Sequence, residues 1–219
     1  MYDSIHRFHV VSTDPKVPQE MEQKGVREPL LCAKCEGRFS RYEKHASEAF
    51  FGDEATVQPV QPGFSKVLSV DYTLFRLFVL SMIWRMSESR LKMFANVDLG
   101  PHAEIIRKAL LADDPLQETQ YPFVVTAVTF QGKFHEDLIL EPDWVRVDQY
   151  RAFRFIIRGL LFFVFVSKQP PPPALAQAIF RRTGGLLVAA KDVDRIPYLK
   201  DALGRMGERI RAQGDQQKP

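Results

Sequence analysis

The sequence predicts an α+β protein in which helices from the first half pack on a small, mostly antiparallel sheet from the second half. Three observations support this fold class. Apolar residues recur every three or four positions before residue 115, β-branched and aromatic residues concentrate after residue 120, and a helical pattern closes the chain. Helices followed by strands are typical of α+β domains. With 45% hydrophobic residues among 219, the chain can bury a sizeable core.

Residues 1–54 are predicted to form a small N-terminal module that ends in a helix. Short β-like stretches come first, and an amphipathic pattern comes after them. The apolar positions of that pattern are Phe39, Tyr42, Ala46, Ala49 and Phe50. Ser40 and Glu43 have the spacing of a capping box, so the regular helix is expected to begin near Ser40. Residues 51–65 contain several Gly and Pro residues and are expected to form a loop.

Residues 55–168 are predicted to be the core domain. Asp71 suits the N-cap of a central helix that is apolar on nearly all sides up to Arg85. Pro101 suits the first turn of the next helix, and Pro115 stops it. After these helices the patterns predict a hairpin over 121–140, a helix over 148–159 and a doubly buried strand over 160–167.

Residues 169–219 are predicted to be a linker, a strand and a final helix. Four consecutive prolines in residues 169–174 favour a stiff polyproline connector. "GGLLVAA", residues 184–190, is the candidate strand. The last helix would carry one apolar face, made of Ile196, Leu199, Leu203, Met206 and Ile210.

Composition limits the classes of partner. The formal net charge of +3 and a pI near 8.8 allow contact with DNA or RNA without requiring it. The most apolar run, residues 155–166, is shorter than the roughly 20 residues of a membrane helix and contains Arg158, so no membrane partner is expected. The first residues lack the pattern of a secretion signal, so a cytoplasmic location is expected.

Cys32 and Cys35, the two cysteines of the chain, form a single C-x2-C pair with three open interpretations. Zinc needs four ligands, and His6 and His9 would complete a Cys2His2 set. A redox dithiol would gain from the lowered thiol pKa at a helix N-terminus. The third interpretation is that both side chains are buried under the first helix as small hydrophobic residues.

Three stretches of the sequence carry a family resemblance: "GVREPLLCAKCEGRFSRYEKHASEAFF", "LFRLFVLSMIWRMSES" and "LGPHAEIIRKALL". Together they resemble an uncharacterised group of bacterial proteins related to HNH-type treble-clef nucleases. The resemblance implies that "LLC-x2-CE" is a zinc knuckle, that Cys32 and Cys35 bind the metal, and that the following helix is the treble-clef helix. It also implies an association with nucleic acid, in phage defence or mobile elements.

The sequence lacks two parts of that family pattern. A first C-x2-C and a Ser-His segment with the general-base histidine would lie upstream, and "MYDSIHRFHVV" resembles the segment that comes directly after them in the family. An HNH nuclease needs a histidine to activate water. His45 is the candidate substitute, one helical turn beyond Arg41. The alternative function is a non-catalytic interaction module, in which the proline tract and last helix bind a protein partner.

Arginines and acids suggest two further sites. Arg151, Arg154 and Arg158 would form a row on one face of the helix predicted over 148–159, suited either to phosphates or simply to solvent. Carboxylates that could bind magnesium or merely face solvent cluster just before it, at Glu136, Asp137, Glu141 and Asp143. Both tryptophans, Trp84 and Trp144, are expected in the core.

Overall fold

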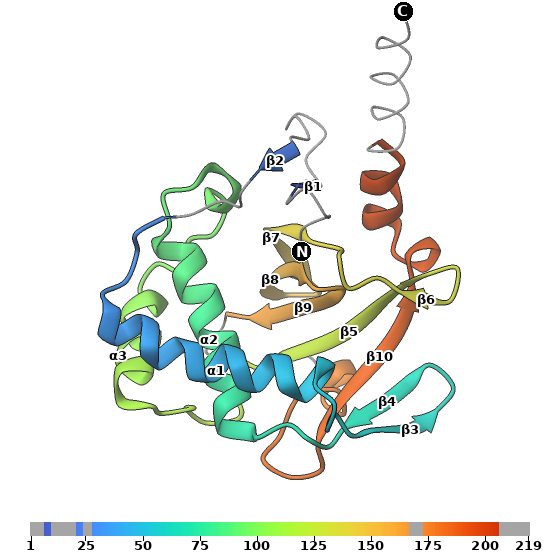
Figure 1. Ribbon diagram of the computed structural model, residues 1–219, viewed down its shortest axis with the longest axis horizontal. Coiled ribbons are helices and arrows are strands. Elements are labelled where there is room, and N and C mark those ends of the chain that lie inside the picture. The colour runs from blue at the N-terminus through green and yellow to red at the C-terminus, as the bar shows by residue number, and fades with distance from the viewer. Residues whose placement is uncertain (1–6, 10–20, 24–27, 167–172, 206–219) are drawn as a thin grey trace, which may run out of the picture.

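An eight-stranded, mostly antiparallel sheet organises the protein, as the computed structural model shows for residues 7–9, 21–23, 28–166 and 173–205 (Figure 1). Its strand order is β3-β4-β10-β5-β9-β8-β7, with β6 paired to β5, and only the β10–β5 pair is parallel. The strands are β3 (Val57–Gln61), β4 (Phe64–Val67), β5 (Phe123–Phe130), β6 (Lys133–Phe134), β7 (Leu140–Val147), β8 (Tyr150–Ile157), β9 (Leu160–Phe165) and β10 (Leu186–Asp192). The protein is therefore mixed α/β.

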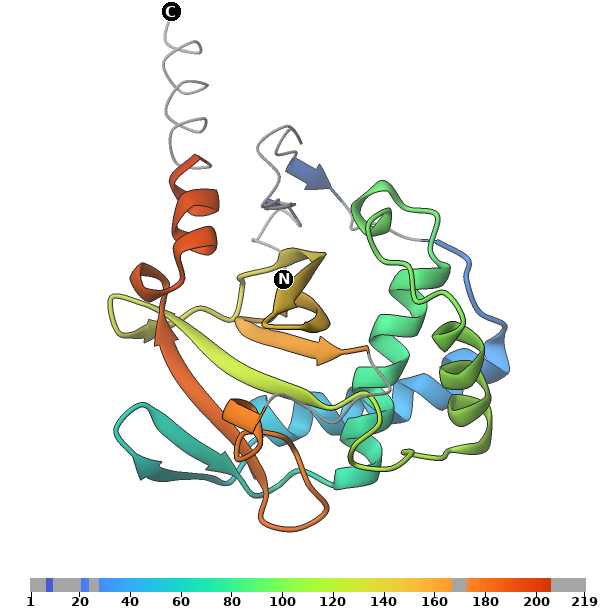
Figure 2. The ribbon, with the colours of Figure 1, turned by 180° about the vertical axis from the view of Figure 1, so that it is seen from behind.

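Helices α1 (Ala33–Phe51) and α2 (Tyr72–Glu88) pack against one face of the sheet, and α3 (His102–Ala112) packs against α2 (Figures 1 and 2). The Asp71 carboxylate accepts a 2.8 Å hydrogen bond from the Leu74 backbone N–H, which confirms the predicted N-cap of α2. α2 is buried on nearly all sides because α1 and α3 flank it. Pro101 precedes α3 as predicted. No helix within the described ranges is both long and apolar enough to cross a bilayer.

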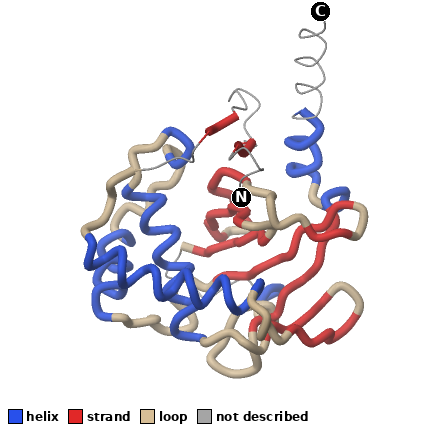
Figure 3. The backbone as a smooth tube through the Cα atoms, viewed as in Figure 1, coloured by secondary structure: helices blue, strands red, loops and turns tan. Residues whose placement is uncertain are grey.

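The opposite face of the sheet is covered by the C-terminal segment. A short 3-10 helix, η3 (Val193–Arg195), leads into a helix described over residues 197–205 (Figure 3). Ile196 and Leu199 from this segment are buried against Ile156 and Leu161 of the sheet. Alternate residues of β8 therefore serve two cores, since Phe153 and Phe155 belong to the cluster under α1 and α2. Met206 and Ile210 of the predicted apolar face lie outside the described residues.

Three segments differ from the sequence prediction. The hairpin predicted over 121–140 is only partly formed, because its second strand is limited to the two residues of β6, and β7 begins at Leu140 and pairs with β8. Residues 148–159 were predicted as a helix, and this is wrong because they form β8 and its flanking turns. Residues 51–65 were predicted as a loop, yet most of them end α1 or form β3 and the start of β4. β3 is an edge strand with all five side chains exposed, so no buried apolar pattern marks it in the sequence.

Two short strands precede α1. β1 (Arg7–His9) and β2 (Met21–Gln23) pair in antiparallel fashion, with His9 opposite Met21. Most of the proline tract, like His6, lies outside the described residues, and its last two residues begin η2 (Pro173–Leu175). The predicted boundaries at residues 54 and 168 stay a prediction. The main core nonetheless joins all three segments, since Tyr42, Phe123 and Leu186 belong to one buried cluster.

Candidate functional site

The two cysteines lie at the first turn of α1. Cys32 is the N-cap residue with extended backbone angles, and its carbonyl accepts a 3.0 Å hydrogen bond from the Glu36 N–H. Cys35 belongs to the first turn of the helix. Cys32 is exposed and Cys35 is half-buried. The interpretation of both as buried packing residues is therefore wrong, and the helix begins seven residues before the predicted capping box at Ser40.

The helix terminus makes the two thiols chemically different. The pKa of Cys32 is lowered, chiefly because the backbone N–H of Cys35 interacts with its sulfur, and then because the Cys35 thiol and the Lys34 N–H do so too. The pKa of Cys35 is raised, first by its hydrogen bond to the Cys32 thiol and second by burial. Cys32 is therefore the thiol of the pair that loses its proton more readily. A thiolate of this kind can bind a metal ion or attack a disulfide.

The other predicted zinc ligands are only partly described. His9 belongs to β1, whose backbone position is known, and His6 lies outside the described ranges. Among the residues whose side chains are described, no group of three or more His, Cys, Asp or Glu lies close enough to hold a metal ion. The zinc set of Cys32, Cys35, His6 and His9 stays a prediction.

His45 connects two helices. Its Nε2 accepts a 2.8 Å hydrogen bond from the Asp71 backbone N–H at the start of α2. The nitrogen that would take a proton from water is therefore already used as an acceptor, and the other ring nitrogen, Nδ1, carries the proton in the neutral form. The structure gives His45 a positioning role between α1 and α2, and its catalytic role stays a prediction.

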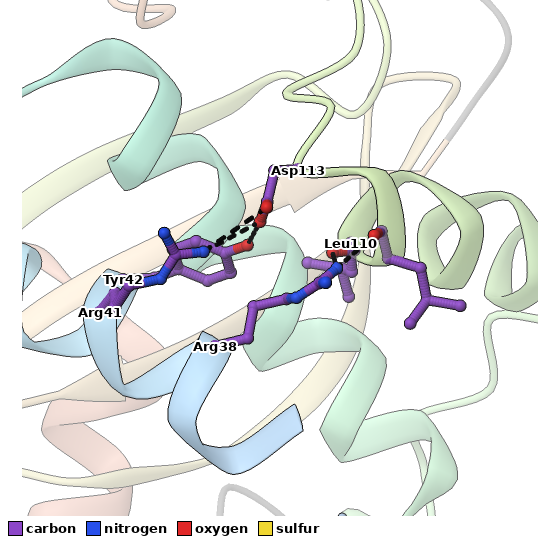
Figure 4. A network of polar contacts seen from close by, with 6 residues as sticks. Arg38, Arg41, Tyr42, Leu110 and Asp113 are labelled. Atoms are coloured by element: carbon purple, nitrogen blue, oxygen red, sulfur yellow. Dashed lines mark hydrogen bonds and ion pairs between the residues drawn. The ribbon is translucent and has the colours of Figure 1, made fainter. Parts of the chain in front are cut away.

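A polar network joins α1 to the end of α3 (Figure 4). The Arg38 guanidinium donates to the carbonyls of Leu110, at 2.9 Å, and of Leu111. The Tyr42 hydroxyl donates to the Asp113 carboxylate, which also lies 3.4 Å from Arg41. Asp113 ends α3 in the left-handed conformation with φ 54°. A guanidinium at the carbonyl end of a helix offsets the negative end of its dipole, so these contacts fix α1 in place.

The structure separates the three arginines that were predicted to form one row. In a strand, residues three apart face opposite sides of the sheet, so Arg151 and Arg154 diverge. Arg154 lies 3.3 Å from the Asp143 carboxylate and 3.7 Å from the centre of the Tyr198 ring in the C-terminal helix. It therefore attaches that helix to the sheet. The row itself is a wrong prediction, while contact of any one arginine with nucleic acid stays untested.

Arg158 ties the β8–β9 turn to α1. Its guanidinium lies 2.6 Å from the Glu136 carboxylate and 3.7 Å from the centre of the Phe51 ring. The acids considered as magnesium ligands are thus partly in use as counterions, since Asp143 serves Arg154 in the same way and Asp137 lies 3.9 Å from the His135 ring.

Arg151 lies elsewhere, on an exposed surface at the end of the β7–β8 hairpin. It is directly opposite Arg146, and its guanidinium lies 5.4 Å from the centre of the Trp144 ring. Trp144 is 48% exposed, so the prediction that it packs in the core is wrong, while Trp84 does pack partly against the core. The sequence suggested that Arg146 lies near the arginine row, but the cross-strand pairing of Arg146 with Arg151 was not predicted because Arg151 was placed on a helix.

Arg76 is a second residue that sequence reasoning missed. It is 1% exposed, and it donates 2.8, 3.2 and 2.7 Å hydrogen bonds to the carbonyls of Pro115, Gln117 and Gln120. Burial lowers the pKa of Arg76. Its position in an apolar helix pattern was the available signal, because a charged residue there needs buried partners. The role is structural, since Arg76 holds the loop after α3.

A shallow pocket lies at the β3–β4 turn. Its lining residues are Pro59, Val60, Gln61, Pro62, Gly63, Phe64, Ser65 and Ala190. None of these side chains is titratable, so no lining residue can act as an acid or as the base that the Ser65 hydroxyl would need to become a nucleophile. The Cys32–Cys35 pair is therefore the better candidate for chemistry.

Comparisons with known proteins give no relative for this fold or this site. No protein-family model, no curated protein and no solved structure matches the chain. The functional proposal consequently depends on the thiol pair and on the surface of the molecule itself.

Proposed function

We propose that Cys32 and Cys35 are half of a zinc site in a nucleic-acid-associated protein related to the HNH-type treble-clef group. The main support is that both thiols lie in one turn at the N-terminus of α1, where the thiolate form of Cys32 is favoured. Zinc thiolate sites use deprotonated cysteines that a tight turn directs at one ion. Cys32 is exposed and Cys35 is half-buried, so the site is open to further ligands on the Cys32 side.

The order of elements supports the same proposal. The antiparallel pair β1–β2 precedes α1, so two strands and then a helix with thiols at its first turn succeed one another along the chain. This order is compatible with the treble-clef resemblance. His9 lies on β1, and with His6 it is the proposed source of the other two ligands. The metal would hold this N-terminal segment against α1 and present it to nucleic acid.

Zinc analysis of the purified full chain tests this proposal. We expect about one zinc ion per chain, as in a four-ligand site. The C32S/C35S and H6Q/H9Q variants should each lose the metal. The matched control is His135→Gln, because His135 is exposed and belongs to no proposed ligand set. Zinc retained by C32S/C35S, or absent from the parent chain at neutral pH, would refute the half-site.

Nuclease activity is a separate part of the proposal. Incubating the zinc-loaded chain with magnesium or manganese and with plasmid, single-stranded DNA or RNA measures it directly. Cleavage that His45→Ala abolishes without loss of folding would assign the base to His45. Cleavage that survives this change would exclude His45 as the base. A chain that binds nucleic acid without cutting it would be the non-catalytic form of the proposal.

The same geometry favours a second candidate, a redox dithiol. The exposed, low-pKa Cys32 would attack a disulfide substrate and release one thiolate, leaving a mixed disulfide. Cys35 would then lose its proton and attack the Cys32 sulfur, which releases the second thiol and leaves a Cys32–Cys35 disulfide. The asymmetry between the two thiols supports this order of events.

Alkylation at different pH values separates the two candidates. In the zinc-free chain, peptide mapping should show iodoacetamide modifying Cys32 at lower pH than Cys35, because the thiolate is the nucleophile. Saturating zinc should protect both thiols if the half-site exists. Formation of the internal disulfide with oxidised glutathione, together with no zinc binding, would favour the redox dithiol. A chain that binds no zinc, forms no internal disulfide and binds no nucleic acid would favour the protein-interaction alternative.

A further inference from the structure

The exposed end of the β7–β8 hairpin carries an unusual arrangement of charge. Arg146 and Arg151 lie directly opposite each other on the two strands, and both are exposed. Side chains in such pairs have Cβ atoms about 5 Å apart, and like charges there are destabilising. Within the part of the chain that the structure describes, no carboxylate forms an ion pair with either guanidinium. An anion from outside would relieve the repulsion.

An aromatic side chain lies on the same face of the hairpin. Trp144 is two residues from Arg146 on β7, and it is directly opposite Phe153, which is two residues from Arg151 on β8. Residues two apart on a strand share a face, as do directly opposite residues. The Arg151 guanidinium lies 5.4 Å from the centre of the Trp144 ring. Trp144, Arg146 and Arg151 therefore form one surface, the Trp144 patch.

The Trp144 patch begins where the helical cover of this face ends. Phe153 and Phe155 of β8 are buried with α1 and α2, whereas Arg151, next along the same face, is exposed. The hairpin also lies at the opposite edge of the sheet from β3 and β4 (Figure 2). The 3-10 helix η1 (Lys92–Phe94) lies beside β7 and adds Lys92, which is exposed and has no ion pair within the described ranges.

We propose that the Trp144 patch binds single-stranded nucleic acid, with a base stacked on Trp144 and phosphates paired with Arg146 and Arg151. Two guanidiniums without a counterion complement phosphate, and an exposed indole offers the flat surface that an unpaired base needs. An acidic peptide would use the charges but not the indole plane. A duplex keeps its bases stacked and cannot use Trp144. The inference rests on the proposed nucleic-acid association, but it does not need the zinc half-site.

Charge alone would not explain the arrangement. β7 is an edge strand, and a charged residue on an edge prevents pairing with other chains. One arginine would suffice to prevent such pairing. A half-exposed tryptophan beside it has the opposite effect, because it favours association with other chains. The net charge of +3 is also too small to bind nucleic acid over the whole surface, so local clustering must supply the affinity.

Fluorescence anisotropy of the full chain with labelled oligothymidylate and oligouridylate tests the proposal. The R146Q/R151Q variant should bind more weakly, and its plot of log K against log salt should be shallower by about 0.7 for each phosphate that is no longer neutralised. The matched control is K133Q/K191Q, which removes the same charge from exposed positions on β6 and β10. Equal affinities of these two double variants would overturn the proposal.

The stacking contact has its own readout. Trp144→Ala should weaken binding by about 10-fold, and Trp144→Phe should restore most of it, because a smaller ring still stacks. Oligonucleotide should quench tryptophan fluorescence in the parent chain and lose most of this effect in Trp144→Phe. Circular dichroism should be unchanged, since the side chain is half-exposed. Unchanged affinity of Trp144→Ala, or tighter binding of polyglutamate than of oligonucleotide, would refute the site.

The C32S/C35S chain distinguishes this inference from the zinc proposal. Oligonucleotide binding that persists in that variant supports the Trp144 patch whether or not zinc is found. If the parent chain binds zinc while R146Q/R151Q binds oligonucleotide as well as its control, only the Trp144 patch is wrong. If the parent lacks zinc while the patch variants lose binding, only the half-site is wrong.

Discussion

His45 and Asp71 are joined by a 2.8 Å hydrogen bond in which the backbone N–H of Asp71 donates to the imidazole Nε2. Asp71 is the N-cap of α2, and its carboxylate already accepts from Leu74. One side chain of α1 thus holds the residue that starts α2. The hydrogen bond joins α1, which carries the thiol pair, to the start of α2. It gives His45 a structural role that can be measured.

Replacing His45 by alanine should lower the free energy of unfolding by about 1 kcal/mol, the net value of a typical hydrogen bond. Urea unfolding followed by circular dichroism measures the change. His135→Ala is the control, since His135 is 43% exposed and its nearest charged partner is 3.9 Å away. If His45→Ala is as stable as the parent chain, the contact with Asp71 contributes nothing to the free energy of unfolding, and a functional role becomes the better explanation for His45.

Replacing Arg76 by methionine should destabilise the protein by about 3 kcal/mol or more. The change keeps the apolar stem but removes the buried donor of three carbonyls, those of Pro115, Gln117 and Gln120. Part of the loss is offset because a buried cation is no longer desolvated. Thermal and urea unfolding measure the effect. Arg107→Met on the exposed side of α3 should change stability far less, because an exposed ion pair contributes little. An Arg76 variant as mild as Arg107→Met would contradict the structural role of the three Arg76 hydrogen bonds.

Gly159→Ala and Gly132→Ala form a matched pair. Both glycines have left-handed angles, with φ 72° and 74°. A Cβ on Gly132 would meet nothing within 4 Å, whereas one on Gly159 would overlap the His135 carbonyl oxygen and lie 2.8 Å from the Phe134 ring. We expect a loss of about 1 kcal/mol for Gly132→Ala from backbone strain alone. Gly159→Ala should lose clearly more, and equal losses in urea unfolding would show that the turn can shift freely.

Tyr42 should make stability fall at high pH. Burial, and then the hydrogen bond to Asp113, raise the pKa of Tyr42 to about 12. The unfolded chain has the ordinary value of about 10. A raised pKa means that the stabilisation is complete below about pH 10 and is lost as the pH rises toward about 12. The stability difference between the parent and Tyr42→Phe should therefore shrink over that interval, and a difference independent of pH would contradict the assignment.

The helices were predictable because local and tertiary signals agree. Asp71 has capping chemistry, and Pro101 and Pro115 bracket α3, so chain-local rules placed these ends. The start of α1 was not predictable in this way. Cysteine is a poor N-cap, whereas Ser40 and Glu43 imitate a capping box inside the helix. Packing of the apolar face of α1 on the core overrides that local preference.

The β7–β8 hairpin was missed because the spacing of the arginines is helical. Arg151, Arg154 and Arg158 lie three or four residues apart, but the residues between them are mostly aromatic and β-branched, as is typical of a strand buried on both faces. The two-residue turn at Asp148 and Gln149 was the available signal, since Asp148 adopts the left-handed conformation that aspartate tolerates. Trp144 and Arg146 become neighbours of Arg151 only through this turn. The candidate nucleic-acid surface could therefore not be predicted as long as residues 148–159 were interpreted as a helix.

β10 is made after every other strand of the sheet, yet it lies between β4 and β5. During translation the β3–β4 hairpin and the β5–β9–β8–β7 part of the sheet are therefore synthesised before the strand that joins them, and until then each has an unpaired edge. Pairing of β10 with β4 and β5 joins parts that are distant in the chain, so we expect it to be a slow step of folding. We expect nascent chains on neighbouring ribosomes to aggregate most readily before β10 has paired with these two edges. A chaperone that covers the edges would therefore be most important before residue 192 emerges.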